Sequence, residues 1–370
     1  MSSANDINFQ LFTEPQLIWH RLAREFAARI PLEEIIASDR DNVFRRDLFE
    51  LACGEKFGAL PFDKTYGGAG GDYVSFCLVN EIFGRCCVPI MSSLGVHVLS
   101  QEPIYKFGTE EQKAKYLKKC ASGKLLAAFA LTEPAAGSDT AAIESTAKLV
   151  GDDYVLNGSK IFITSASVAD IFIVFARLPE GITAFIVDKD TKGLSIGQKF
   201  DMLGMRGYGT CEIVFSDCII PKSNILGLPG MGRKIALSSL AKGRVTIAAQ
   251  ALGWARGALD GLSKCMKESE NHHIIGSLVV NIEAASALTY HAARSIDQGS
   301  GNVTLAAMAK LRATDIAMSA ADQVLTLTGT KGLQPEYLIE RIFRDAKAGQ
   351  IYEGTNQIQR LLIARDIFSS

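Results

Sequence analysis

Three segments of this 370-residue chain concentrate side chains that could do chemistry. Residues 129–139 read FALTEPAAGSD, residues 158–166 read GSKIFITSA, and residues 344–360 read RDAKAGQIYEGTNQIQR. The first segment supplies hydroxyls beside a turn, the second an aromatic ring and a hydroxyl at alternate positions, and the third a loop carboxylate. A carboxylate that is shielded from water can act as a general base, and an aromatic ring beside a hydroxyl suits a flat heteroaromatic ligand.

The first two segments also have an ordinary structural interpretation. Thr132 and Ser138 flank a turn, where such hydroxyls usually bond to the local backbone. Phe162 and Thr164 share one face of a predicted strand, and an aromatic residue on a strand is more often part of ordinary sheet packing. Neither segment alone therefore requires a ligand.

The carboxylate of the third segment belongs to Glu353, which stands between Tyr352 and a glycine just before a predicted helix. A single glutamate in a loop is usually a solvated surface charge or a partner of a helix dipole. Taken alone, this segment also favours a structural role.

The elements that must position these segments begin with a helical region. Leu22, Phe26 and Ile30 recur every four residues, and Thr109 to Gln112 form a capping box that opens a later helix. We therefore expect residues 1–125 to form a helical N-terminal domain.

The periodicity changes in the middle of the chain. From about Leu126 to Leu226, short β-branched and aromatic runs alternate with turns, as in a small antiparallel barrel or sandwich. Asn157–Gly158 is a hairpin signal, and Pro179-Glu180-Gly181 separates two further strands. Residues 126–228 are predicted to form a β domain.

The helical period returns for the rest of the chain. Four long helices are predicted at residues 234–266, 278–296, 305–327 and 356–368, which suggests a four-helix bundle over residues 229–370. The predicted fold class is mainly α with one β domain.

Composition excludes several classes of function. Lys and Arg number 39 against 40 for Asp and Glu, a balance that leaves no excess positive charge for nucleic acid or an anionic membrane. No apolar run is long enough for a membrane span, and the N-terminus carries no export signal, so we expect a cytoplasmic protein. The eight cysteines show no CxxC spacing, which predicts neither a disulfide framework nor a metal site.

The three segments, in this order and together with LGMRG at residues 203–207 and the later Thr210, resemble the acyl-CoA dehydrogenase family over nearly the whole chain. The resemblance implies α,β-dehydrogenation of an acyl thioester with FAD as the cofactor. It also implies a homotetramer with FAD bound between subunits, and electron-transfer flavoprotein as a candidate partner.

The resemblance assigns Glu353 as the base that removes the α-proton, while the β-hydrogen leaves as hydride to flavin N5. Burial by flavin and acyl chain would raise the pKa of this carboxyl toward the operating pH. Cofactor-binding positions match Phe129, Leu131, Thr132, Ser138, Phe162, Thr164, Thr355 and Gln357.

Substrate-binding positions match Ser138, Tyr208, Gly243, Arg244 and Tyr352. Some family members place the base on a bundle helix instead, at the position that is Gly243 here, so Glu353 is the expected base. Tyr208 replaces a small hydroxyl residue near the thioester arm, which suggests an unusual acyl group.

Two family motifs are altered. RxxFG corresponds here to residues 270–276, ENHHIIG, and QxxGGxG corresponds to residues 326–332, TLTGTKG. The first motif loses its arginine and aromatic residue and the second a glutamine and a glycine, so we expect a weakened FAD contact across the subunit boundary and a dimer as an alternative to the tetramer. Lys331, His272 and His273 could compensate.

These departures leave other functions open. A divergent relative could act on acyl groups bound to a carrier protein instead of CoA. The same scaffold could work as a flavin-dependent oxidase or monooxygenase, or as a non-catalytic binding subunit with impaired FAD binding.

Overall fold

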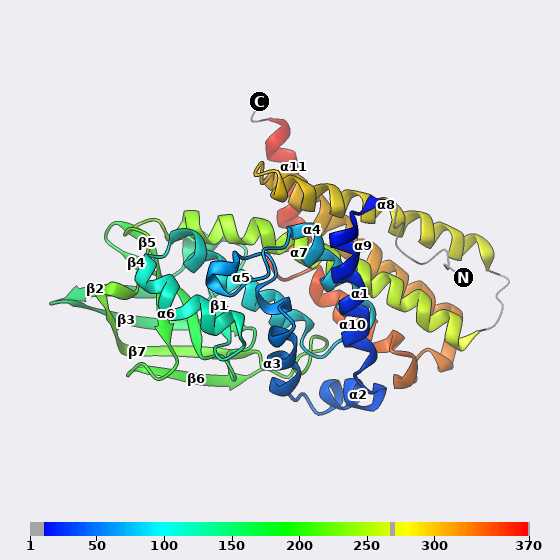
Figure 1. Ribbon diagram of the computed structural model, residues 1–370, viewed down its shortest axis with the longest axis horizontal. Helices are drawn as coiled ribbons and strands as arrows, with labels where there is room; N and C mark the ends of the chain where they lie inside the picture. Colours follow the sequence, from blue (N-terminus) through cyan, green and yellow to red (C-terminus); the bar gives the residue numbers. More distant parts are fainter. Residues whose placement is uncertain (1–10, 267–270, 369–370) are drawn as a thin grey trace.

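A computed structural model describes residues 11–266 and 271–368. Helices gather at both ends of the chain and a sheet lies between them in sequence (Figure 1). The first helical region contains α1 (Glu14–Ala28), α2 (Leu32–Arg40), α3 (Arg46–Gly54), α4 (Tyr73–Arg85), α5 (Met91–Phe107) and α6 (Glu110–Ala121).

The predicted capping box at the start of α6 is confirmed. The backbone N–H of Gln112 donates to Thr109 Oγ1 at 3.3 Å, and the backbone N–H of Thr109 donates to Gln112 Oε1 at 3.0 Å. These bonds satisfy donors that a helix start otherwise leaves free, so the helix begins at this position.

The middle region forms one eight-stranded sheet in the order β6-β7-β3-β2-β4-β5-β8, with β1 paired to β4 outside this path. Its strands are β1 (Ala127–Ala130), β2 (Thr146–Val150), β3 (Asp153–Ile163), β4 (Ile171–Leu178), β5 (Gly181–Asp188), β6 (Leu194–Lys199), β7 (Cys211–Pro221) and β8 (Ile225–Leu226). Most strand pairs are antiparallel, as expected, but β4 pairs in parallel with both β1 and β2. Parallel pairing requires a long crossover, and here the β2–β3 hairpin lies within the connection from β1 to β4.

The two predicted hairpin turns have different outcomes. Pro179 and Glu180 do form the turn between β4 and β5, since Leu178 pairs with Gly181. The predicted hairpin turn at Asn157–Gly158 is wrong, because both residues lie inside β3, where the register with β7 shifts. Gly158 has a φ of +138° and a Cβ there would lie 2.4 Å from Ser145 Oγ, so the glycine serves an irregular, crowded strand and not a turn.

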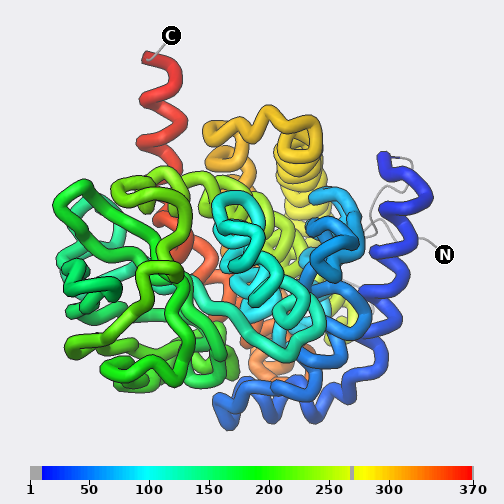
Figure 2. Tube along the Cα trace, turned by 60° about the vertical axis from the view of Figure 1, so that its left-hand side comes forward, coloured from blue at the N-terminus to red at the C-terminus, as the bar shows by residue number. Residues whose placement is uncertain are grey.

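The C-terminal helices are α7 (Gly232–Cys265), α8 (His272–Asp297), α9 (Val303–Thr328), α10 (Ile339–Gly349) and α11 (Asn356–Ile367). The second predicted helix starts earlier than expected, so Gly276 lies inside α8. The predicted fourth helix is present as α11, but it extends away from the body and packs mainly on α9 (Figures 1 and 2). The short α10, which the periodicity did not predict, packs on α7 and α9.

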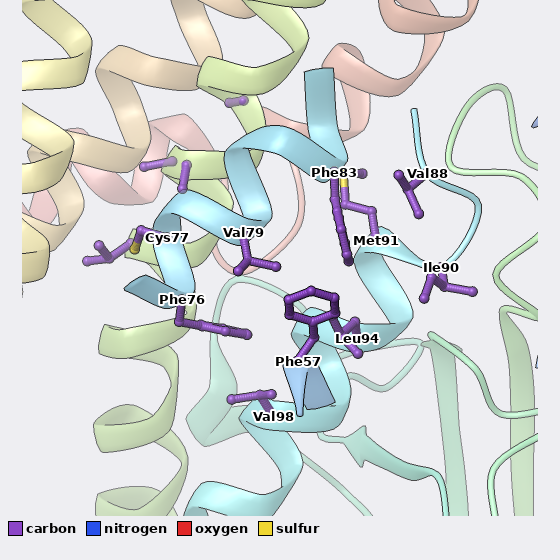
Figure 3. Close-up of a cluster of buried hydrophobic side chains, with 14 of the residues drawn as sticks. Phe57, Phe76, Cys77, Val79, Phe83, Val88, Ile90, Met91, Leu94 and Val98 are labelled. Carbon is purple, nitrogen blue, oxygen red and sulfur yellow. The ribbon is translucent and has the colours of Figure 1, made fainter. Parts of the chain in front are cut away.

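Aromatic packing holds the first helical region together. Figure 3 shows Phe57, Phe76 and Phe83 with Met91 and Leu94 in one buried cluster. The rings of Phe57 and Phe83 meet edge to face, with centroids 5.5 Å apart.

The helix α4 approaches the backbone of α7 closely. A Cβ at Gly84 would lie 2.4 Å from Gln250 O, so this contact requires a glycine. No helix within residues 11–266 or 271–368 combines the length and apolar content that crossing a membrane requires.

Candidate active site

Glu353 lies in a tight turn between α10 and α11. Its φ is +51°, a left-handed conformation that costs a non-glycine residue about 1–3 kcal/mol, and Gly354 follows with a φ of +90°. Hydrogen bonds hold this backbone: Asn356 N–H donates to Gln350 O at 2.9 Å, and Gln359 Nε2 donates to Gly354 O at 2.8 Å. The strained turn is therefore fixed from both sides.

The carboxylate of Glu353 lies directly against α7. A Cβ built on Gly243 would be 2.1 Å from Glu353 Oε2 and 2.9 Å from Cδ, so only a glycine leaves room for this side chain. Oε2 is buried, and no donor among the described residues reaches it. The same helix position thus carries no base of its own and makes space for Glu353.

Burial raises the pKa of Glu353 to about 7, against the opposing effect of two cations. One is Arg244 on α7, which is 5% exposed. The other is Lys310 on α9, which is fully buried. A carboxyl with a pKa near neutrality is well suited to accept a proton from carbon and release it afterwards.

Arg244 also has an unsatisfied atom. Its Nε finds no hydrogen-bond acceptor in the part of the chain that the structure describes. Burial lowers the pKa of this guanidinium and the Glu353 charge raises it. Buried charged groups with unpaired atoms are rare in native proteins, so the two residues together indicate a place where a polar ligand binds.

Two tyrosines complete the surroundings of Glu353. Tyr352 donates its hydroxyl to Gln250 Oε1 at 3.3 Å. Tyr73, at the first turn of α4, donates to Lys242 O at 2.7 Å and lies 2.6 Å from Thr246 Oγ1. Sequence reasoning missed Tyr73, because nothing in its local sequence shows that α4 and α7 meet here.

A narrow cavity lies beside Gly243, between α4, α5 and α7. An ion pair between Lys242 Nζ and Glu102, 2.6 Å long, forms part of its wall. The lining residues are Tyr73, Gly95, Val98, Leu99, Glu102, Ser239, Lys242, Gly243 and Thr246. The cavity therefore adjoins the Glu353 carboxylate and is small.

The segment that follows β1 is tied to β3. Leu131 O accepts from the buried Lys160 Nζ at 3.2 Å, and Thr132 O accepts from Ile161 N–H at 2.9 Å. Lys160 also forms a buried ion pair of 2.5 Å with Glu133. Sequence reasoning missed this pair, although both charged residues lie within the two segments it singled out.

Phe162 and Thr164 do not share a strand face as predicted. The register shifts between Lys160 and Ile163, Phe162 has a φ of +55°, and β3 ends before Thr164. The bulge turns the Phe162 ring outward, where it is 51% exposed and packs against Phe200 at a centroid distance of 4.6 Å. An exposed ring on a strained backbone, next to a half-buried hydroxyl, fits the flat ring of a heteroaromatic ligand.

The other predicted cofactor positions are dispersed. Phe129 on β1 is half-buried and packs on Phe175, with centroids 5.0 Å apart. Ser138 is exposed in the loop that follows. Thr355 caps α11 by accepting from Ile358 N–H at 3.3 Å, and Gln357 is exposed in the first turn of that helix.

Tyr208, predicted to lie near the thioester arm, is buried in the structure. It is 1% exposed, its hydroxyl lies 3.5 Å from Val88 O, and it does not line the cavity. Burial raises its pKa, and it lies near enough to Tyr352 to raise the pKa of that residue too. The structure brings Glu353, Gly243, Arg244 and Tyr352 together but takes Tyr208 into the core.

The altered motifs are partly exposed where they are described, although Thr328 and Gly332 of the second motif are buried. Glu270 is outside the described residues, whereas His272 and His273 are exposed at the start of α8. Lys331 is exposed in the short turn that follows α9. Whether these side chains contact a cofactor stays a prediction.

The chain matches models of one protein family and is similar to several known proteins. Models of the acyl-CoA dehydrogenase N-terminal, middle and C-terminal domains match residues 13–124, 128–218 and 230–368. The short-chain specific acyl-CoA dehydrogenase of Clostridium acetobutylicum is 39% identical over 383 aligned positions, covering 98% of this chain and 100% of that protein.

Two solved structures are similar over nearly their whole length. Butyryl-CoA dehydrogenase from Megasphaera elsdenii has a TM-score of 0.93 at 35% identity, covering 98% of this chain and 100% of the other. The prolyl acyl carrier protein oxidase AnaB has a TM-score of 0.89 at 28% identity, covering 96% of this chain and 99% of the other.

Proposed function

Because the chain belongs to the acyl-CoA dehydrogenase family, we propose that it oxidises a short-chain acyl-CoA between its α and β carbons. The observation that carries this proposal is the buried, unpartnered Oε2 of Glu353, which lies against Gly243 beside a small cavity. A base in that place faces the α carbon of an acyl chain that enters the cavity.

Glu353 is the proposed base. Its carboxylate accepts the α-proton, which neutralises a charge that burial disfavours. Arg244 remains positive beside it and favours the ionised form before the transfer. Tyr352 and Tyr73 have strongly raised pKa values, so both stay neutral, and Tyr73 lines the cavity.

FAD is the cofactor of the proposed reaction, and when bound it accepts the β-hydrogen as a hydride. The exposed Phe162 ring and the half-buried Thr164 and Thr132 would hold the flavin ring. Thr355 and Gln357 lie at the N-terminal end of α11, where backbone N–H groups favour an anionic nucleotide group.

The small size of the cavity supports a short acyl chain as the substrate. The Lys242–Glu102 pair and Tyr73 limit its size, and a longer chain would have to displace an ion pair of 2.6 Å. The names of the C. acetobutylicum and M. elsdenii relatives, short-chain specific and butyryl, support the same size class.

CoA is the proposed carrier of the acyl group. The two CoA-named relatives are 39% and 35% identical to this chain, whereas the acyl carrier protein oxidase is 28% identical. A comparison of flavin reduction by butyryl-CoA and by the same acyl group on a carrier protein tests the choice. Faster reduction by the carrier-bound group would overturn it.

The first test of the reaction uses Glu353→Gln. We expect the variant to keep its flavin absorption, since the amide has the shape of the carboxylate, and to lose most bleaching by butyryl-CoA under anaerobic conditions. Normal bleaching in the variant would contradict the proposed base. Oxygen consumption by the wild-type protein during turnover would favour an oxidase, and a protein that stays colourless with added FAD would favour a binding subunit.

A further inference from the structure

Lys310 is a fully buried lysine whose charge the proposed reaction leaves unexplained. It lies on α9, and its Nζ donates to Gly354 O at 2.9 Å and to Asn356 Oδ1 at 2.8 Å. Both acceptors belong to the stretch that directly follows Glu353. The ammonium group thus binds the turn that carries the proposed base.

Further bonds anchor the same turn to α9. Asn356 Nδ2 donates to Thr314 Oγ1 at 3.0 Å and to Asp315 Oδ1 at 2.8 Å. Gln350, at the other end of the turn, donates to Asp315 Oδ1 at 2.8 Å. One face of α9, formed by Lys310, Thr314 and Asp315, therefore fixes both ends of the strained turn.

The positive charge of Lys310 is costly where it lies. Its two bonded acceptors are a carbonyl and an amide oxygen, and burial lowers its pKa to about 7 although Glu353 and Asp315 oppose the change. A neutral side chain would avoid this desolvation, and the turn has other anchors. The charge itself thus needs an electrostatic explanation.

We propose that Lys310 is the positioning residue of the base: its ammonium group fixes the Glu353 turn and keeps the Glu353 carboxylate ionised. The inference rests on the proposed role of Glu353. A carboxylate can accept the α-proton only in its ionised form, and a nearby cation favours that form in a buried site.

The charged and titratable groups around Glu353 come from four elements. Arg244 on α7 and Lys310 on α9 are the cations that lower its pKa. Tyr73 on α4 and Tyr352 in the turn itself stay neutral, because burial and the Glu353 charge raise their pKa values. Loss of the Lys310 charge would leave Arg244 as the one cation of this group.

The test separates the charge of Lys310 from its hydrogen bonds. Lys310→Gln keeps a donor without the charge, Lys310→Arg keeps the charge, and Lys310→Met removes both. Infrared difference spectra of the purified proteins at several pH values report ionisation of Glu353, whose band is identified by its loss in Glu353→Gln. The pH dependence of flavin reduction by butyryl-CoA gives a second readout.

We expect Lys310→Gln to raise the midpoint of the Glu353 titration by about one pH unit and to slow reduction at neutral pH about fivefold, with recovery at higher pH. Lys310→Arg should keep the wild-type midpoint. Lys234→Gln, which neutralises an exposed lysine on α7, is the matched control and should change neither readout.

An unchanged midpoint in Lys310→Gln, with reduction slowed equally at every pH, would overturn the electrostatic role and leave a structural one. Thermal unfolding shows which variants fold. If the neutral variants do not, a raised midpoint in Lys310→Arg overturns the proposal and an unchanged midpoint supports it. Normal turnover in Glu353→Gln would instead refute the proposed base, so the two failures are distinguishable.

Discussion

The carboxylate of Glu353 is confined by a glycine on one side and influenced by two cations, Arg244 and Lys310. Each neighbour has a separate effect: the absent side chain of Gly243 gives room, and the cations oppose the rise in pKa that burial causes. The function proposed for this residue therefore depends on the space around it as much as on its own chemistry.

Gly243→Ala tests that space. The new Cβ would lie 2.1 Å from Glu353 Oε2, so the carboxylate must move by an ångström or more. We expect flavin reduction by butyryl-CoA to slow about 100-fold, because a base displaced by that distance loses alignment. Flavin content should stay normal.

The matched control is Gly54→Ala in the last turn of α3, where a Cβ would meet nothing within 4 Å. It should leave reduction unchanged and raise the free energy of unfolding by about 1 kcal/mol, since alanine is the better helix former. Equal rates in the two variants would show that Gly243 does not hold space for the base.

His97 makes stability depend on pH. It is fully buried, its Nδ1 accepts from Ala127 N–H at 3.0 Å, and its Nε2 lies 3.1 Å from Cys120 O. Burial lowers its pKa from 6.5 to about 4, so the unfolded chain binds a proton between these values and the folded protein does not. The contribution of neutral His97 to the free energy of unfolding is complete above pH 6.5 and is lost as the pH falls toward 4.

We expect His97→Gln to be less stable than the wild type at neutral pH but to lose less stability on acidification, by about 3 kcal/mol over this range. Urea unfolding of both proteins at neutral and acidic pH measures the difference. If both proteins lost the same free energy of unfolding on acidification, His97 would not be the source of the pH dependence.

At the scale of elements, local signals in the sequence were reliable where local contacts decide the structure. The α6 capping box and the β4–β5 turn involve residues within a few positions of one another. Asn157–Gly158 has the same local turn signal, yet β7 and Ser145 impose an irregular strand there. The parallel pairing of β4 likewise depends on contacts that are distant in sequence, so periodicity could not predict it.

The same distinction holds for the site. Family motifs identified Glu353, Gly243, Arg244 and Tyr352, which the structure brings together. Tyr73 and Lys310 reach the site only through the packing of α4, α7 and α9, and no pattern near them in the sequence predicts that contact.

The buried Lys160–Glu133 pair aligns the segment after β1 with β3 and gives a prediction for this pair of elements. Burial lowers the pKa of Lys160 to about 8, while Glu133, its carboxylate partner, opposes that change. Lys160→Met removes one partner and should lower the free energy of unfolding by about 3–5 kcal/mol. It should also weaken flavin binding, because Leu131 O loses its donor.

Urea unfolding and flavin content measure these effects. Lys148→Met, which replaces an exposed lysine on the neighbouring strand β2, is the control and should alter neither. A wild-type flavin content in a destabilised Lys160→Met would limit the pair to a role in stability.

At the scale of the whole molecule, α11 is the helix least supported by its own chain. Only Asn356 and Gln359 of this helix are buried, while Leu361 is 50% exposed and Phe368, directly after the helix, is 86% exposed. Figure 2 shows the helix pointing away from the body. A protruding helix with exposed apolar side chains is typical of an interface, and a second copy of this chain fits the homo-oligomer that the family resemblance implies.

We therefore expect light scattering to give the mass of a dimer or tetramer. Leu361→Asp and Phe368→Asp should shift that mass toward the monomer, because a charge in an apolar interface loses hydration without a partner. Loss of assembly should also reduce flavin content, since Thr355 and Gln357 begin the same helix. A wild-type protein that stays monomeric with flavin bound would contradict the assembly and place the whole cofactor site within one chain.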